Sequence, residues 1–93
     1  MAIAIMNDVP GVTQRQYDQV SEKLRQQGVT VPVAGQLFHA AGPIDGGWRT
    51  VDVWESREAA DRCFGEHLAA IFAEVGITAD QPPQVFPIHA LYK

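Results

Sequence analysis

The fold is decided by the stretch Gly46-Gly47-Trp48-Arg49-Thr50-Val51-Asp52-Val53-Trp54-Glu55-Ser56 and by the segment that follows it to Gly76. Residues 48–55 alternate in the manner of a β-strand. Ser56 is a residue type that caps helices, and the apolar positions after it recur at helical spacing. The residues on that stripe are Ala60, Phe64, His67, Leu68, Ile71 and Val75. A strand that runs directly into a capped amphipathic helix is typical of a small sheet with helices on one face.

The predicted strand 48–55 has two unlike sides, because successive side chains of a strand point to opposite faces. One side carries two valines, and the other carries two tryptophans with two polar residues between them. The two sets are Val51 and Val53, and Trp48, Thr50, Asp52 and Trp54. A solvated face would not carry two tryptophans, whose large rings are usually buried. We therefore expect both sides to be covered, one of them by something outside the two-layer monomer.

The remaining sequence supplies a helix and three further strands. Thr13 with Gln16 three positions later forms a capping-box pattern, and Gly28 is a residue type that ends helices. Strands are predicted at residues 2–7, 34–41 and 84–92, with an antiparallel turn at 42–47. Pro87 places the last strand at an edge, because proline cannot donate to a sheet ladder. The order βαββαβ predicts an α+β, ferredoxin-like antiparallel sheet, with the first and third strands central and two helices on one face.

Length and charge narrow the class of protein. The 93 residues suffice for one domain, residues 1–93, which buries roughly 60–65% of its unfolded surface. The net charge of −4 without a basic stripe argues against nucleic acid and anionic membranes as partners. No segment approaches the ~20 apolar residues of a membrane span. The start MAIAIMND lacks the basic region of a signal peptide, and Cys63 is the single cysteine, so we expect a cytoplasmic protein.

Several phrases of this chain are similar to those of a known superfamily. They are Val51-Asp52-Val53-Trp54-Glu55-Ser56, the following Arg57-Glu58-Ala59-Ala60, Phe38-His39-Ala40-Ala41-Gly42-Pro43 and Val85-Phe86-Pro87-Ile88-His89. Together with the order of elements, they resemble the dimeric α+β barrel superfamily, and within it the small antibiotic-biosynthesis-monooxygenase-like proteins. The resemblance implies a homodimer whose two sheets face each other, with a pocket between sheet and helices in each subunit. In such a dimer we expect the second copy to cover the tryptophan side of residues 48–55. It also implies one of several activities: cofactor-free oxygenation of polyphenols, haem degradation, isomerisation or ligand binding.

The resemblance transfers few functional residues to this chain. Thr50 stands where the quinone-forming monooxygenases have an asparagine, four residues before the strand tryptophan. Cys63 and Ala73 stand where haem-degrading members have a tryptophan and a histidine, and Asn7 alone matches their first-strand asparagine. We therefore do not expect haem degradation.

His39 and Asp52 are the candidate catalytic residues. The hairpin pairing brings them close on one face, where the carboxylate would orient the imidazole as a general base. A register change of one residue would separate them to opposite faces. The alternative is a core histidine satisfied by a neighbour and an aspartate that anchors a loop or a dimer seam.

Five further residues are candidates for binding a substrate: Asn7, Trp54, Phe64, His67 and His89. Trp54 would stack on a planar ligand, and its alternative is a core residue. His67 lines the pocket, His89 reaches the pocket or the partner, and Asn7 serves a ligand or forms a turn. Cys63 and His67 share a helical face, but a zinc site needs three or four ligands, so we expect no metal. The sequence lacks a nucleotide-binding fingerprint, and we expect no cofactor.

Two functions remain open from the sequence. In the first, the protein is a small cofactor-independent, monooxygenase-like or isomerase-like enzyme that acts on a hydrophobic, aromatic or polyketide-like molecule. In the second, it is a non-catalytic ligand-binding or accessory dimer in which the histidines are structural.

Overall fold

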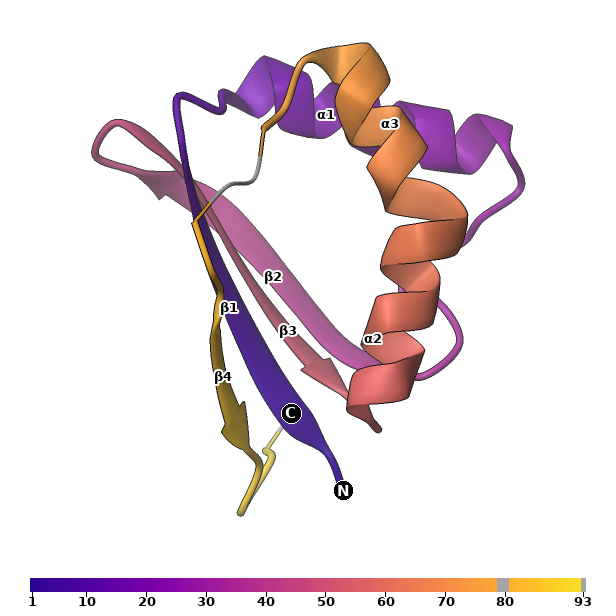
Figure 1. Cartoon of the computed structure of the whole chain (residues 1–93), viewed down its shortest axis with the longest axis vertical. Helices are drawn as coiled ribbons and strands as arrows, with labels where there is room; N and C mark the ends of the chain where they lie inside the picture. The colour runs from indigo at the N-terminus through magenta and orange to yellow at the C-terminus, as the bar shows by residue number, and fades with distance from the viewer. Residues whose placement is uncertain (79–80, 93) are drawn as a thin grey trace.

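The chain folds into one four-stranded antiparallel sheet with helices on one side of it (Figure 1). The computed structural model describes residues 1–78 and 81–92. The strands are β1 Ile3–Pro10, β2 Gln36–Ile44, β3 Gly47–Trp54 and β4 Gln84–Pro87, in the order β2-β3-β1-β4. The helical segments are α1 Gln14–Gln26, α2 Arg57–Cys63, η1 Phe64–Leu68 and α3 Ala69–Val75. The predicted βαββαβ order, the central first and third strands and the ferredoxin-like fold are confirmed.

Helix α1 begins and ends where the sequence predicts. The Thr13 hydroxyl accepts a hydrogen bond from the Gln16 backbone N–H, while the Gln16 side chain accepts one from the Thr13 N–H. This capping box satisfies two N–H groups that the helix itself leaves unpaired. Gly28, two residues after the helix, has the positive φ of 78° that glycine adopts without strain. Val20 and Leu24 are the buried residues of α1 and pack against Ile71 of α3.

The second helical region is continuous, but it is not regular. Its first turn is capped by the Ser56 hydroxyl, as predicted, and it stops at Gly76 with a positive φ. Between α2 and α3 lies one turn of π-helix, η1, which changes the phase of the inward-facing stripe. Before this turn Ala59 and Cys63 are buried, and after it Ile71 is buried. Phe64 is therefore largely exposed, at 46%, where the regular helical pattern predicts a core position.

Three strand boundaries differ from the sequence-based expectation. Strand β1 runs on to Pro10, and it tolerates this proline because β4 pairs only as far as Met6, which leaves the end of β1 at an edge. Strand β2 continues to Ile44, so the turn contains only Asp45 and Gly46. Strand β4 stops at Pro87 because its partner Ile3 is the first residue of β1.

The tryptophan side of β3 faces the helices of its own chain. Trp54 packs with Ala59 and Cys63 of α2, and the ring of Trp48 lies 5.3 Å from that of Tyr17 on α1. Both tryptophans are buried in the single chain, at 5% and 8% exposure. The expectation that a second copy covers this side is therefore wrong. Two tryptophans on a strand indicate a covered face, but they do not indicate what covers it.

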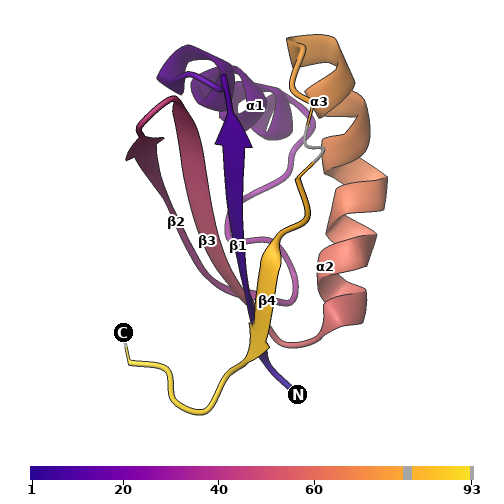
Figure 2. The same ribbon diagram turned by 60° about the vertical axis from the view of Figure 1, so that its left-hand side comes forward.

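The other side of the sheet carries no helix, as the view from the β4 edge shows (Figure 2). Strand register places a largely apolar set of side chains there: Ala4, Met6, Phe38, Ala40, Val51, Val53 and Phe86. We call this set the open face. Phe38 and Phe86 are 38% and 54% exposed, whereas Ala4 and Val53 between them are buried. After Pro87 the chain turns away from the helices (Figure 2).

Candidate functional site

Four side chains form a hydrogen-bonded chain between α1 and the sheet. The Tyr17 hydroxyl lies 2.6 Å from His39 Nε2, and His39 Nδ1 lies 2.5 Å from Asp52 Oδ1. The same Asp52 oxygen accepts a hydrogen bond of 2.9 Å from Gln36 Nε2. We call these four residues the relay. The sequence prediction that His39 and Asp52 meet is confirmed, because the hairpin register places them directly opposite each other.

Gln36 joins the relay because of an irregularity in β2. The pairing of β2 with β3 shifts between Gln36 and Phe38, so Leu37 is an additional residue in the strand. Without it, alternation would put Gln36 on the open face together with Phe38. The bulge turns Gln36 to the helix side, opposite Trp54. Its amide oxygen accepts the Val33 N–H, which leaves the amide nitrogen to donate to Asp52.

These contacts define how the hydrogens are placed. A carboxylate only accepts hydrogen bonds, so Asp52 requires a hydrogen on Nδ1 of His39. In the neutral imidazole the other nitrogen, Nε2, is then an acceptor, and it receives the hydroxyl hydrogen of Tyr17. The direction of donation is therefore from Tyr17 to His39 and from His39 to Asp52. This is the arrangement by which a carboxylate sets the tautomer of a catalytic histidine.

The Tyr17 side chain is held by Trp48, which contacts its ring, and by His39, which meets its hydroxyl end. The Tyr17 ring is nearly parallel to the His39 ring, with 3° between the planes, and it contacts the Trp48 ring at a tilt of 32°. Burial raises the pKa of the Tyr17 hydroxyl, so the phenol keeps its hydrogen at neutral pH. Within residues 1–78 and 81–92, the buried indole nitrogen of Trp48 has no hydrogen-bond partner. Trp48 thus positions the phenol by packing.

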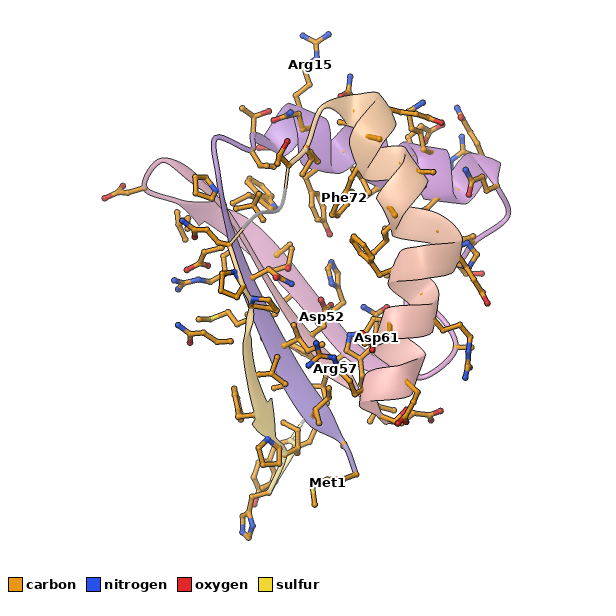
Figure 3. All side chains as sticks on the ribbon, viewed as in Figure 1. Met1, Arg15, Asp52, Arg57, Asp61 and Phe72 are labelled. Atoms are coloured by element: carbon orange, nitrogen blue, oxygen red, sulfur yellow. The ribbon has the colours of Figure 1, made fainter. Side chains whose placement is uncertain are left out.

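The relay is partly accessible to solvent. The side chains of His39 and Asp52 are 23% and 15% exposed. Ala41, which pairs with Thr50 on the same side of the sheet, is exposed, so this part of β2 is not covered by a helix. Asp52 of β3 and Phe72 of α3 lie on the two layers that flank this region (Figure 3).

Two hollows of the surface lie away from the relay. One, of about 460 Å³, is on the outer surface of α1 and is lined by polar residues from Gln14 to Glu22. The other, of about 260 Å³, is on the open face beside Arg49 and Val51. Neither hollow includes His39 or Trp54.

The other candidate residues lie outside the relay. Asn7 is mid-strand and pairs with Thr50, one row from the relay on the same side of the sheet. Trp54 is a core residue, and Phe64 meets Phe72 edge to face. The two remaining candidates are His67, whose imidazole lies 3.9 Å from the Glu66 carboxylate, and His89, which is exposed beyond β4. The helical pattern placed Phe64 and His67 in a pocket because it does not show the π-helical turn.

Two relay residues, Tyr17 and Gln36, were not identified from the sequence as site residues. Tyr17 had a usable signal, because a phenol on the inward stripe of α1 with Val20 and Leu24 needs a hydrogen-bond partner. Gln36 had no such signal, since its side of the sheet depends on the bulge at Leu37.

Two further features of the described residues concern metal ions and membranes. Among the described residues there is no group of three or more histidine, cysteine, aspartate or glutamate side chains placed to hold a metal ion. Across residues 1–78 and 81–92, each helix is too short or too polar to cross a bilayer.

Comparison with known proteins supports the fold and leaves the activity open. No protein family and no curated protein matches this sequence. The structure is similar to the crystal structure of a conserved protein from Methanosarcina mazei Go1, with a TM-score of 0.59 and 12% sequence identity. The match covers 92% of this chain and 89% of the other. At this identity the similarity shows a shared fold alone.

Proposed function

We propose that the protein is a small cofactor-independent enzyme that binds a hydrophobic, aromatic or polyketide-like molecule and moves one of its protons. The observation that carries this proposal is the relay, in which Asp52 orients His39 and His39 accepts the Tyr17 hydroxyl hydrogen. The resemblance of the sequence to antibiotic-biosynthesis-monooxygenase-like proteins supports the substrate class by analogy.

The relay stabilises the fold no more than apolar side chains in its place would, and this favours a functional role for it. Its polar groups lose part of their contact with water, and the net gain from a typical hydrogen bond is only about 1 kcal/mol. Apolar residues of similar volume stabilise a protein core at least as well as a buried polar network. A histidine held between a carboxylate and a phenol is, in contrast, well arranged to accept a proton.

Proton removal is also the step that starts a cofactor-independent oxygenation. Removing a proton from an enolisable ring ketone leaves a carbanion, which supplies the electrons that reduce O₂. For anthrone the overall reaction is anthrone plus O₂ to anthraquinone plus water, which balances in atoms and electrons. Anthrone is therefore a suitable test substrate for this class.

The proposal is tested with anthrone and purified protein, by following O₂ uptake and anthraquinone absorbance. We expect His39→Gln and Asp52→Asn to lower the rate by about 10²–10⁴-fold, the usual contribution of a positioned acid or base. His89→Gln is the matched control, because His89 is exposed and outside the relay. Equal rates for the wild type, His39→Gln and Asp52→Asn would contradict the proposal.

A second function, a non-catalytic ligand-binding or accessory dimer, is favoured by one observation. Neither of the two hollows described above reaches His39. In a protein of this second kind, the relay would serve only to hold α1 on the sheet. In that case neither the wild type nor His39→Gln converts anthrone, and His39→Gln lowers the melting temperature of the protein.

The proposal includes a homodimer that is formed through the open face. The resemblance implies that two sheets face each other, and this face carries the exposed rings of Phe38 and Phe86. A stable interface buries about 1,200–2,000 Å² in total, and a helix-free sheet face offers a continuous apolar surface for it. The free thiol of Cys63 is buried, which suits a reducing compartment such as the cytoplasm.

A further inference from the structure

We infer that Tyr17, rather than His39, meets the ligand, and that the ligand is a neutral weak acid with a phenolic or enolic hydroxyl group. This inference rests on the proposed function and assigns a further catalytic residue to it. In this arrangement His39 and Asp52 act through the Tyr17 hydroxyl.

The first argument is that both nitrogens of His39 are engaged. Nδ1 is bonded to Asp52 and Nε2 to Tyr17, so neither nitrogen is left for a ligand. A general base must come within about 2.6–3.2 Å of the proton that it removes. The Tyr17 oxygen can meet this condition, because it gives its hydrogen to His39 and, beside its hydrogen bond with Ser21, keeps a lone pair for another donor.

The second argument is that Tyr17 is held in place but not sealed off. Its ring packs against Trp48 and its hydroxyl is hydrogen-bonded to His39, and together these contacts fix the direction of the hydroxyl. The residue is nonetheless only half-buried, and Ala41 beyond His39 on the same side of the sheet is exposed. A ligand can therefore approach the oxygen from the uncovered part of β2.

The proton transfer is balanced without any redox partner. The ligand O–H bond breaks as a new O–H bond forms on Tyr17, while the original Tyr17 O–H bond breaks and an N–H bond forms on His39 Nε2. The products are the ligand anion, a neutral tyrosine and an imidazolium beside the Asp52 carboxylate. The two shifts are concerted, because burial raises the pKa of Tyr17 and disfavours a free phenolate.

The charge around the relay selects the ligand class. Asp52 is a carboxylate within one hydrogen bond of His39, so a ligand that is already anionic would be repelled. Asn7 and Thr50 supply an amide and a hydroxyl one row away on the same side of the sheet. A neutral hydroxyl on a hydrophobic ring fits these neighbours, and the amide can stabilise the oxyanion that forms.

The experiment uses 4-nitrophenol, whose coloured phenolate reports its own ionisation. The probe is titrated with protein about one pH unit below its free pKa. We expect the wild type to ionise the bound probe and Tyr17→Phe to lower the ionised fraction by about tenfold or more. Tyr92→Phe is the matched control, because Tyr92 is 90% exposed. An ionised fraction that is unchanged in Tyr17→Phe would overturn the inference.

A second measurement tests the free protein and needs no ligand. We expect ¹⁵N NMR to show His39 with its hydrogen on Nδ1, and the Nε2 resonance to shift in Tyr17→Phe but not in Tyr92→Phe. A hydrogen on Nε2 would overturn the inference, since His39 would then donate to Tyr17. Anthrone separates the two claims. Turnover that persists in Tyr17→Phe refutes the role of Tyr17, whereas probe ionisation without anthrone turnover refutes only the oxygenation.

Discussion

Tyr17 combines packing and proton donation in a single side chain. Its ring rests on Trp48, and its hydroxyl gives a hydrogen to His39. The sequence could predict the pair His39 and Asp52, because alternation and hairpin pairing are local rules. It could not show that α1 delivers a phenol to that pair, because this contact joins segments 22 residues apart and depends on how the helix lies on the sheet.

The raised pKa of Tyr17 predicts a pH dependence of stability. Burial is its main cause, a hydrogen bond with Ser21 opposes it, and the charges of Asp52 and Asp18 add to it. The folded state thus holds this proton to higher pH than the unfolded state, whose tyrosine ionises near about pH 10. The associated stability is complete below that pH and is lost as the pH rises through the folded-state pKa.

We therefore expect Tyr17→Phe to lose less stability than the wild type between about pH 9 and 11. Urea unfolding at a series of pH values measures this difference. Burial also raises the pKa of the Cys63 thiol, so both proteins are compared in a Cys63→Ala background. If the free energies of unfolding of the two proteins change in parallel with pH, Tyr17 has the same pKa in the folded and unfolded states, and the prediction is wrong.

At the scale of elements, two irregularities decide where side chains point. The additional residue Leu37 turns Gln36 toward Asp52, and the π-helical turn η1 turns Phe64 out of the core. Capping residues such as Thr13 and Ser56 marked the helix starts correctly, because a cap acts within one turn. A single additional residue has no comparable local signature, so sequence patterns continue across it in the wrong phase.

The π-helical turn can be tested by shortening it. Deleting Gly65 would make residues 57–75 a regular helix in which Cys63 and Ile71 are seven positions apart and lie within about 20° of each other around the helix axis. Both side chains can then stay buried, and we expect the free energy of unfolding to fall by only about 1 kcal/mol or less. Urea denaturation gives this value.

Gly65→Ala is the control for that deletion, because it keeps the number of residues. A methyl group at Gly65 meets nothing within 4 Å, and alanine favours helix over glycine by up to about 1 kcal/mol. We expect this variant to be as stable as the wild type or slightly more stable. A deletion variant that loses about 3 kcal/mol or more would show that the π-helical turn does more than accommodate one additional residue.

At the scale of the whole molecule, the open face determines whether the chain acts alone. We expect the wild type to sediment as a dimer and Phe38→Glu to sediment as a monomer, because a charge in a buried apolar interface costs several times RT. Sedimentation velocity at micromolar concentration measures both. Phe64→Glu is the matched control, since Phe64 is exposed on the helix layer. A monomeric wild type, or a dimeric Phe38→Glu, would rule out this interface.

The Tyr17–His39 contact joins the helix layer to the sheet layer, and in the proposed mechanism it also transfers a proton. These two roles conflict when a larger ligand binds. If α1 moved away from the sheet to make room, the Tyr17 hydroxyl would lose its hydrogen bond to His39 and with it the group that accepts its proton. A larger binding site would therefore be gained at the expense of the basicity of the Tyr17 hydroxyl. Evolution toward broader substrate range on this scaffold would therefore begin with small side chains on α2 and α3 and leave α1 in place.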